Sequence, residues 1–202
     1  MIIFQYIGGI VGLGGTSLMI YKIKKKEETE QNFVSWFLCA ILDAIVAIST
    51  ITNPTAEGYG NWFLPVTYTL GALCICFAIY KYGGIKKLDS VEYGTIIGII
   101  FCLFIWIAIG NISAIIVSTT IICLSWLPQM KDTWNMPLKT PTLVYVIWGV
   151  AEFLSFVGGK TWTVEERFYA GVEFVIGLVV ILFSLRKYRK ITNPEKLVVK
   201  KV

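Results

Sequence analysis

Long apolar runs, separated by short polar stretches, follow one another along the whole chain. A membrane-spanning helix needs about 20 mostly apolar residues, within a range of about 17 to 25. Seven runs meet this range, at residues 4–21, 33–51, 62–80, 93–109, 111–130, 142–158 and 167–185. The pattern predicts an all-α membrane protein with seven transmembrane helices. The first run has no basic stretch before it and no convincing cleavage site after it, so we expect a retained helix rather than a signal peptide.

Basic residues gather in every second polar stretch. The stretches after the first, third, fifth and seventh runs hold most of them, within 22–26, 81–87, 131–139 and 186–201. The stretches in between hold only Lys160 and Arg167. Because loops rich in Lys and Arg stay on the cytoplasmic side, this alternation predicts an N-terminus outside and a C-terminus in the cytosol.

The two halves of the chain can be aligned as copies of each other. A shift of 109 residues places Asp43 on Glu152 and Trp36 on Tyr145. The predicted units are a first three-helix repeat at 1–88, a linker helix at 89–110, a second repeat at 111–190 and a cytosolic tail at 191–202. Three crossings alone would invert the second copy, whereas the extra helix makes the repeats parallel, in a 3+1+3 arrangement. Chance similarity between apolar helices is the alternative.

The composition strengthens the assignment to a membrane. Of 202 residues, 56% are hydrophobic and 15% are charged, which is more apolar than a soluble domain. Loop topology explains the net charge of +5, and no basic and aromatic surface suited to nucleic acid is visible. Histidine is absent, so proton handling falls to carboxylates. The five cysteines lie in apolar runs as small hydrophobes, and we expect no metal and no cofactor.

Three acidic residues lie inside the apolar runs. Asp43 is near the middle of the second run, Glu152 near the middle of the sixth, and Glu173 in the outer half of the seventh. A carboxylate at such a depth costs about 2.5–3.5 kcal/mol on insertion scales. Apart from Arg167 at the very start of the seventh run, no Lys or Arg accompanies them. A proton, a bound cation or a polar neighbour must therefore compensate.

Two interpretations of these acids stay open. In the first, Asp43 and Glu152 face each other between the repeats and bind a proton or a cation during each cycle. In the second, each is permanently protonated and forms a hydrogen bond with a neighbouring helix. Glu173, which a shift of 106 residues places opposite Thr67, belongs either to the same site or to its outer vestibule.

Several aromatic side chains lie deep in the runs rather than at their ends. These are Trp36, Tyr68, Trp106, Tyr145 and Trp148, and the deeper ones could line a pocket with the acids, together with Thr67. Aromatic faces beside carboxylates suit an organic cation. The tryptophans expected to anchor the protein at the lipid headgroups are Trp62, Trp126, Trp134 and Trp162.

The fifth run ends on Pro128 and Gln129, just before Lys131. Proline has no N–H and its ring presses on the preceding turn, so Pro128 is a candidate hinge. A Pro-Gln pair that closes a membrane helix before a basic loop resembles the signature of the PQ-loop family. This family includes the SWEET sugar transporters, the lysosomal amino-acid exporters and the KDEL receptor. The first repeat has Met19 and Ile20 at the matching place, so the expected hinge is Pro128 with Gln129 in the second repeat.

The resemblance implies a seven-helix carrier that moves a solute by alternating access. Sugar-carrying members use an asparagine in the third helix of each repeat, and the runs 62–80 and 167–185 contain none. The intramembrane acids Asp43 and Glu152 look more like those of the proton-coupled amino-acid exporters. We therefore expect a transporter of a small polar solute, cationic or zwitterionic, with proton coupling.

Two alternatives stay open, namely a non-transporting receptor or assembly protein of the same fold and a sugar transporter. An enzyme is not expected, because histidine and a Gly-x-Ser-x-Gly sequence are both absent. The expected partners are the small-molecule solute and the lipid bilayer, without nucleic acid, and a homo-oligomer is left open. The default location is the plasma (inner) membrane, or an organelle membrane if the protein is eukaryotic.

Overall fold

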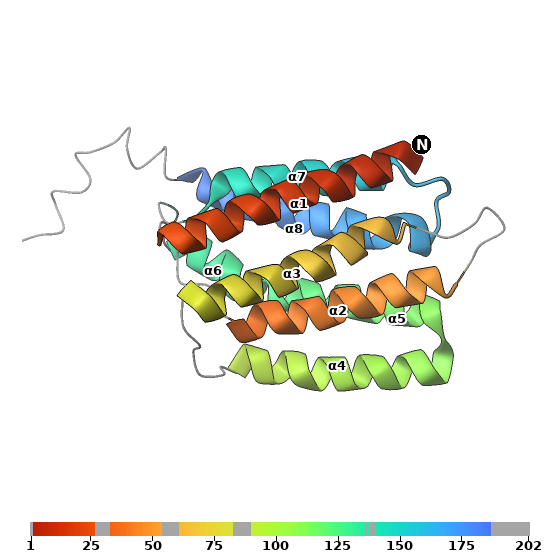
Figure 1. The fold of residues 1–202 in the computed structure, drawn as a ribbon. Helices are drawn as coiled ribbons and strands as arrows, with labels where there is room; N and C mark the ends of the chain where they lie inside the picture. The colour runs from red at the N-terminus through yellow and green to blue at the C-terminus, as the bar shows by residue number, and fades with distance from the viewer. Residues whose placement is uncertain are drawn as a thin grey trace, which may run out of the picture.

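The computed structural model describes residues 2–26, 33–53, 61–82, 90–135, 137 and 140–186, and all regular structure in this part of the chain is helical (Figure 1). The all-α prediction is confirmed. The helices in chain order are α1 Ile2–Lys25, α2 Phe33–Ile51, α3 Phe63–Tyr82, α4 Ser90–Ile109, α5 Asn111–Ser125, α6 Leu127–Asn135, α7 Thr142–Val157, the π-helical turn η2 Val164–Phe168, and α8 Tyr169–Ser184. The predicted tail 191–202 lies outside the described residues.

Five helical stretches are long and apolar enough to cross a membrane, counted over the described residues: Ile2–Lys25, Phe33–Ile51, Phe63–Tyr82, Asn111–Asn135 and Val164–Ser184. Two further apolar helical stretches, Tyr93–Ile109 and Thr142–Val157, are shorter. The exterior is apolar, with Ile107 88% exposed, whereas Asp43 is only 6% exposed. Apolar side chains outside and acids inside are the distribution of a protein in lipid, so the chain is an integral membrane protein.

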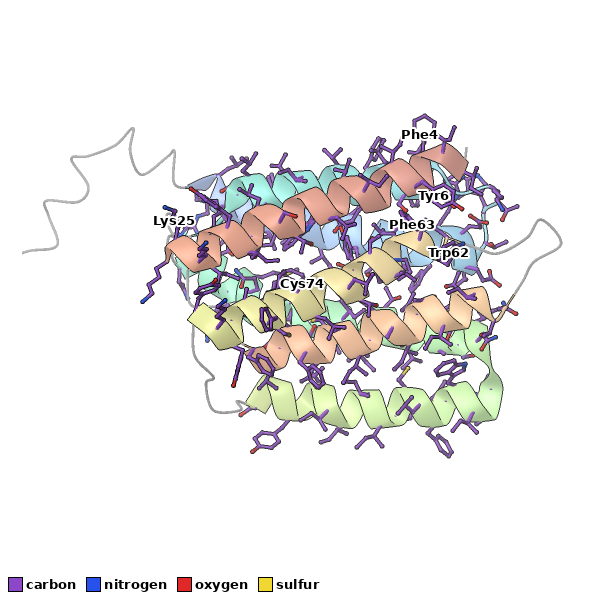
Figure 2. The ribbon with its side chains drawn as sticks, viewed as in Figure 1. Phe4, Tyr6, Lys25, Trp62, Phe63 and Cys74 are labelled. Atoms are coloured by element: carbon purple, nitrogen blue, oxygen red, sulfur yellow. The ribbon has the colours of Figure 1, made fainter. Side chains whose placement is uncertain are left out.

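The helices lie side by side, and their ends gather at two opposite ends of the bundle (Figure 1). Figure 2 shows Lys25 at one end, here called the lysine end, and Tyr6, Trp62 and Phe63 toward the other. The segment 158–168 between α7 and α8 lies at this second end, which we call the Glu166 end. Tyr6 and Phe63 pack there edge to face, with ring centroids 4.9 Å apart.

The helix contacts fall into two similar groups. In the first, α3 packs between α1 and α2; in the second, α8 packs on α7 and on α5 and α6. Between the groups, α1 packs on α7, and α2 packs on α5. The two groups correspond helix by helix: α1 to α5–α6, α2 to α7, and α3 to α8. Under this correspondence, the contact between α1 and α7 matches the contact between α5 and α2. The remaining helix, α4, lies at the edge against α5 and α2 (Figure 1).

The fifth span is interrupted near the predicted hinge. The α-helix α5 ends at Ser125, Trp126 forms a turn, and α6 continues the same span from Leu127. Hydrogen bonds continue on both sides, since Trp126 N donates to Ile122 O (3.1 Å) and Met130 N to Trp126 O (3.0 Å). Pro128 has no N–H to donate to the carbonyl four residues before it, which accounts for a weak point in the helix at this place.

A face of glycines on α1 allows close packing against α7 and α3. A Cβ at Gly8 would lie 2.6 Å from the backbone oxygen of Ala151 in α7, and one at Gly12 would lie 2.8 Å from the Tyr68 ring in α3. A Cβ at Gly15 would lie 2.7 Å from the Trp148 ring. The absence of side chains at these positions thus lets α1 approach the other helices closely and leaves space for Tyr68 and Trp148.

We expect Gly8→Ala to lower the melting temperature of the purified protein in detergent. The new methyl group would overlap a backbone oxygen that cannot rotate away, and overpacking of this kind costs about 1–3 kcal/mol. Gly14→Ala is the matched control, because Gly14 lies on the same helix and nothing lies within 4 Å of the position that a Cβ there would take. Equal melting temperatures for Gly8→Ala, Gly14→Ala and the parent protein would contradict this account of the α1–α7 contact.

Candidate functional site

A cavity lies in the middle of the bundle, between the two helix groups. Six helices contribute to its wall, α1, α2, α3, α5, α7 and α8, as does the turn after α5. Its lining residues are Thr16, Trp36, Cys39, Asp43, Tyr68, Ala72, Ile75, Ile122, Trp126, Tyr145, Trp148, Glu152, Glu173, Ile176, Gly177 and Val180.

The cavity brings together most of the residues selected from the sequence. Those that line it are Asp43, Glu152, Glu173, Trp36, Tyr145, Tyr68 and Trp148. Thr67 does not line it. Its hydroxyl donates to Leu64 O (2.8 Å) in the preceding turn, and its methyl group packs toward Gly9 of α1. Neighbouring residues on a helix point about 100° apart, so Tyr68 reaches the cavity and Thr67 packs against α1.

Helices α2 and α7 present matching faces to the cavity. The contributions of the two helices are Trp36, Cys39 and Asp43 from α2, and Tyr145, Trp148 and Glu152 from α7. Both sets have the spacing i, i+3 and i+7, which places three side chains along one face of a helix. Each helix therefore carries an aromatic residue near the lysine end of the cavity and an acid two turns deeper.

Each of these acids accepts a hydrogen bond from a tyrosine in the other helix group. The Tyr169 hydroxyl, on α8, donates to Asp43 Oδ1 (2.7 Å), and the Tyr68 hydroxyl, on α3, donates to Glu152 Oε1 (3.0 Å). The two tyrosine rings meet edge to face, with centroids 6.5 Å apart. These two tyrosine–acid hydrogen bonds therefore cross the interface between the helix groups and hold the groups together at the centre of the bundle.

Two carboxyl oxygens in the cavity lack a hydrogen-bond partner among the described residues, namely Glu152 Oε2 and Glu173 Oε1. Both residues are 4% exposed. Glu152 Oε2 lies 3.1 Å from the position that a Cβ at Gly177 would take, and Gly177 is one helical turn from Glu173 on α8. Glu173 thus belongs to the same cavity as Glu152.

Four aromatic rings form a closed cycle between the acids and the lysine end. This aromatic cluster consists of Trp36, Trp126, Tyr145 and Trp148, with successive ring centroids 6.3, 6.1, 5.6 and 5.9 Å apart around the cycle. Trp148 Nε1 donates to Gly12 O (3.2 Å), which fixes that ring against α1. Trp126, expected at the lipid headgroups, instead lines the cavity at the turn between α5 and α6.

The Glu166 end of the bundle is closed by a buried polar network. Glu166 is 1% exposed, and its Oε2 accepts from Gln5 Nε2 (2.8 Å) on α1 and from Lys160 N (3.2 Å). Asn61, just before α3, donates through Nδ2 to Ser155 Oγ (2.9 Å) on α7 and to Glu166 O (3.3 Å). These contacts join helices of both groups around the start of η2.

Arg167 strengthens the same end by capping the segment between α7 and α8. Its guanidinium donates to the backbone oxygens of Thr161 (2.8 Å), Phe156 (2.7 Å) and Gly159 (2.6 Å). It also lies over the Trp162 ring, 4.2 Å from the centroid. Because every one of these contacts is local, Arg167 fixes the shape of the segment that holds Glu166 in place.

The predicted hinge residues lie beyond the cavity wall, in α6. Gln129 is half-buried, and its Nε2 donates to Thr133 Oγ1 (3.3 Å) on the same helix. Pro128 lies two residues after Trp126, which belongs to the aromatic cluster. Over the described residues, no group of three acids or cysteines is placed to hold a metal ion.

Sequence reasoning missed Tyr169, Gln5 and Glu166. Tyr169 lies close to the start of an apolar run, where a tyrosine usually anchors to headgroups, and Glu166 lies in a stretch that was assigned to a polar loop. Gln5 carried a usable signal, since an amide near the start of an apolar run needs a partner. Comparisons with models of protein families, with curated proteins and with solved structures found no significant match.

We expect Tyr169→Phe to lower the stability of the protein by about 1–3 kcal/mol, because Asp43 Oδ1 would lose its hydrogen-bond donor while staying buried. Thermal unfolding in detergent, followed by tryptophan fluorescence, measures the change. Tyr93→Phe is the control, since Tyr93 is 57% exposed on the edge helix α4. Equal losses for both variants would show that the Tyr169–Asp43 contact contributes nothing specific.

Proposed function

We propose that the chain is a membrane carrier that moves a small polar solute, cationic or zwitterionic, by alternating access. The observation that carries the proposal is a pair of unpartnered carboxyl oxygens, Glu152 Oε2 and Glu173 Oε1, in a central cavity between two helix groups. A buried carboxyl group without a partner is costly, and it is retained most readily where a solute or a proton binds it.

The proposal includes a 3+1+3 arrangement of parallel repeats. In it, α1–α3 form the first repeat, α4 is the linker, and α5–α8 form the second. Three observations support it: the exchange symmetry of the helix contacts, the matching spacing of cavity residues on α2 and α7, and the crossed tyrosine–acid contacts. The similarity of Pro128 and Gln129 to the PQ-loop signature points the same way. Binding at the interface between repeats is typical of secondary transporters.

Sidedness follows from the distribution of basic residues. Lys22, Lys24 and Lys25 in the last turn of α1, and Lys81 near the end of α3, put the lysine end in the cytosol under the positive-inside rule. The cavity extends from the acids toward this end, past the aromatic cluster, while the Glu166 network closes the opposite end. In the proposed cycle this arrangement is a state closed to the outside, in the plasma membrane by default.

The mechanism balances charge at each step. With no solute bound, protons neutralise the buried carboxyl groups; a cationic group of the solute replaces a proton when it binds. Bending of the fifth span near Pro128 moves Trp126 away from Trp36 and Tyr145, which opens or closes the cytosolic path. Separation of Gln5 and Asn61 from the Glu166 segment opens the other side.

Uptake of radiolabelled cationic and zwitterionic solutes into proteoliposomes, driven by a pH gradient, tests the role of the acids. We expect Glu152→Gln and Asp43→Asn to reduce uptake by about tenfold or more, as expected for the loss of a charged hydrogen-bonding group. Thr67→Val is the control and keeps uptake near the parent level, because Thr67 faces away from the cavity. Unchanged uptake in the two acid variants would remove these residues from the mechanism. A parent protein without any flux but with a stable protein partner would favour the receptor alternative.

Labelling of Cys39 tests the closed outer side. With Cys74, Cys76, Cys102 and Cys123 replaced by alanine, a membrane-impermeant thiol reagent should reach Cys39 from the lysine side and not from the other. The double variant Asn61→Ala/Arg167→Ala weakens the Glu166 network and should increase labelling from the opposite side. Equal labelling from both sides before the network is weakened would contradict the proposed closure. Size-exclusion chromatography checks that the double variant is folded.

A further inference from the structure

We infer that the cavity selects an organic ammonium cation that carries N–H donors and an apolar or aromatic body, and that it rejects ligands with a carboxylate. This inference rests on the carrier proposal only for its consequence in transport, because the binding preference follows from the cavity itself. It narrows the solute from a cation or zwitterion to an amine.

The charge of the cavity wall excludes a carboxylate on the ligand. Asp43, Glu152 and Glu173 all line the cavity, and no Lys or Arg is found among the described lining residues. The carboxylate of an amino acid would be placed among three acids without a cation to pair with. Burying such a charge unpaired costs several kcal/mol, which exceeds what its amino group could gain from the same acids.

The unpartnered oxygens require N–H donors. Glu152 Oε2 and Glu173 Oε1 are buried acceptors, and each needs a donor within hydrogen-bond distance to offset its desolvation. The other oxygen of Glu152 already has a donor, since the Tyr68 hydroxyl donates to Glu152 Oε1. A primary ammonium group has three donors and can serve both oxygens, whereas a quaternary ammonium group has none.

The aromatic cluster determines which kind of apolar body the ligand can have. Trp36, Trp126, Tyr145 and Trp148 line the cavity on the lysine side of the acids, together with the aliphatic Ile75, Ile122 and Val180. Trp148 Nε1 is already bound to Gly12 O, so this indole contributes its ring rather than its N–H. An amine with an aromatic or branched aliphatic body fits such a wall, with attraction between its cationic group and the ring faces.

One monovalent cation leaves one of the two unpartnered carboxyl groups unneutralised. This second carboxyl group then keeps its proton, which it donates in a hydrogen bond. Binding of the amine at Glu152 and Glu173 thus exchanges one proton for one cation, while Asp43 remains held by Tyr169. Asp43 is accordingly a positioning residue, and the two glutamates form the ligand-binding pair.

Four ligands that share a phenyl ring on a two-carbon chain and differ in their polar groups test the inference: 2-phenylethylamine, phenylalanine, 3-phenylpropionate and N,N,N-trimethyl-2-phenylethylammonium. Binding to the full-length purified protein is measured by quenching of tryptophan fluorescence and by thermal shift. We expect 2-phenylethylamine to bind about tenfold to a hundredfold more tightly than each of the others, as expected for charged hydrogen bonds lost or a buried charge unpaired.

Glu173→Gln should weaken binding of 2-phenylethylamine by about tenfold or more. Glu165→Gln is the matched control, because Glu165 accepts from Asn53 Nδ2 (2.9 Å) at the Glu166 end and lies outside the cavity. Should Glu173→Gln fail to fold, the order of affinities of the four ligands for the parent protein still tests the inference. Tighter binding of phenylalanine or of the trimethyl compound than of the amine would overturn the inference, and so would no binding of any of the four.

Flux of the same compounds in proteoliposomes separates this inference from the carrier proposal. Tight binding of 2-phenylethylamine without flux would leave the binding preference in place and contradict the carrier. Flux of an amino acid or a sugar, with no binding of the amine, would support the carrier and contradict the inference.

Discussion

A buried carboxyl group in an apolar helical bundle must be neutralised or hydrogen-bonded, and the arrangement of this protein follows from that requirement. Tyr169 and Tyr68 each offer one hydroxyl to an acid, from the opposite helix group in both cases. Two donors do not satisfy three acids, and Glu152 Oε2 and Glu173 Oε1 remain without a partner among the described residues. In the proposed mechanism, this unmet requirement for donors makes the centre of the bundle a binding site rather than a packed core.

The rest of the fold supports this centre. The glycine face of α1 lets that helix approach α7 and α3, and it leaves room for the rings of Trp148 and Tyr68. The aromatic cluster lines the cavity on the lysine side of the acids, and the Glu166 network joins helices of both groups at the other end. The fifth span is interrupted at Trp126, two residues before Pro128, and Trp126 also lines the cavity. The interruption in this span therefore lies at the cavity wall.

Apolar runs predicted the helices well, because length and hydropathy are properties of a segment by itself; α2 begins and ends as expected, at Phe33 and Ile51. The acids were also visible, since a charge inside an apolar run stands out. The contacts could not be predicted, because they depend on which face of a helix turns inward. Asp43 and Tyr169 are 126 residues apart in the sequence. Thr67 and Tyr68 are adjacent, yet Thr67 packs against α1 and Tyr68 lines the cavity, which depends on where α1 lies.

Proton release on ligand binding tests the central claim most directly. Titration calorimetry with 2-phenylethylamine at neutral pH, in two buffers that differ in their enthalpy of ionisation, counts the protons exchanged. If the cavity must always be neutralised by a proton or a cation, about one proton leaves for each ammonium bound. Binding in the same cavity with no proton released, and with an affinity independent of pH, would contradict the account.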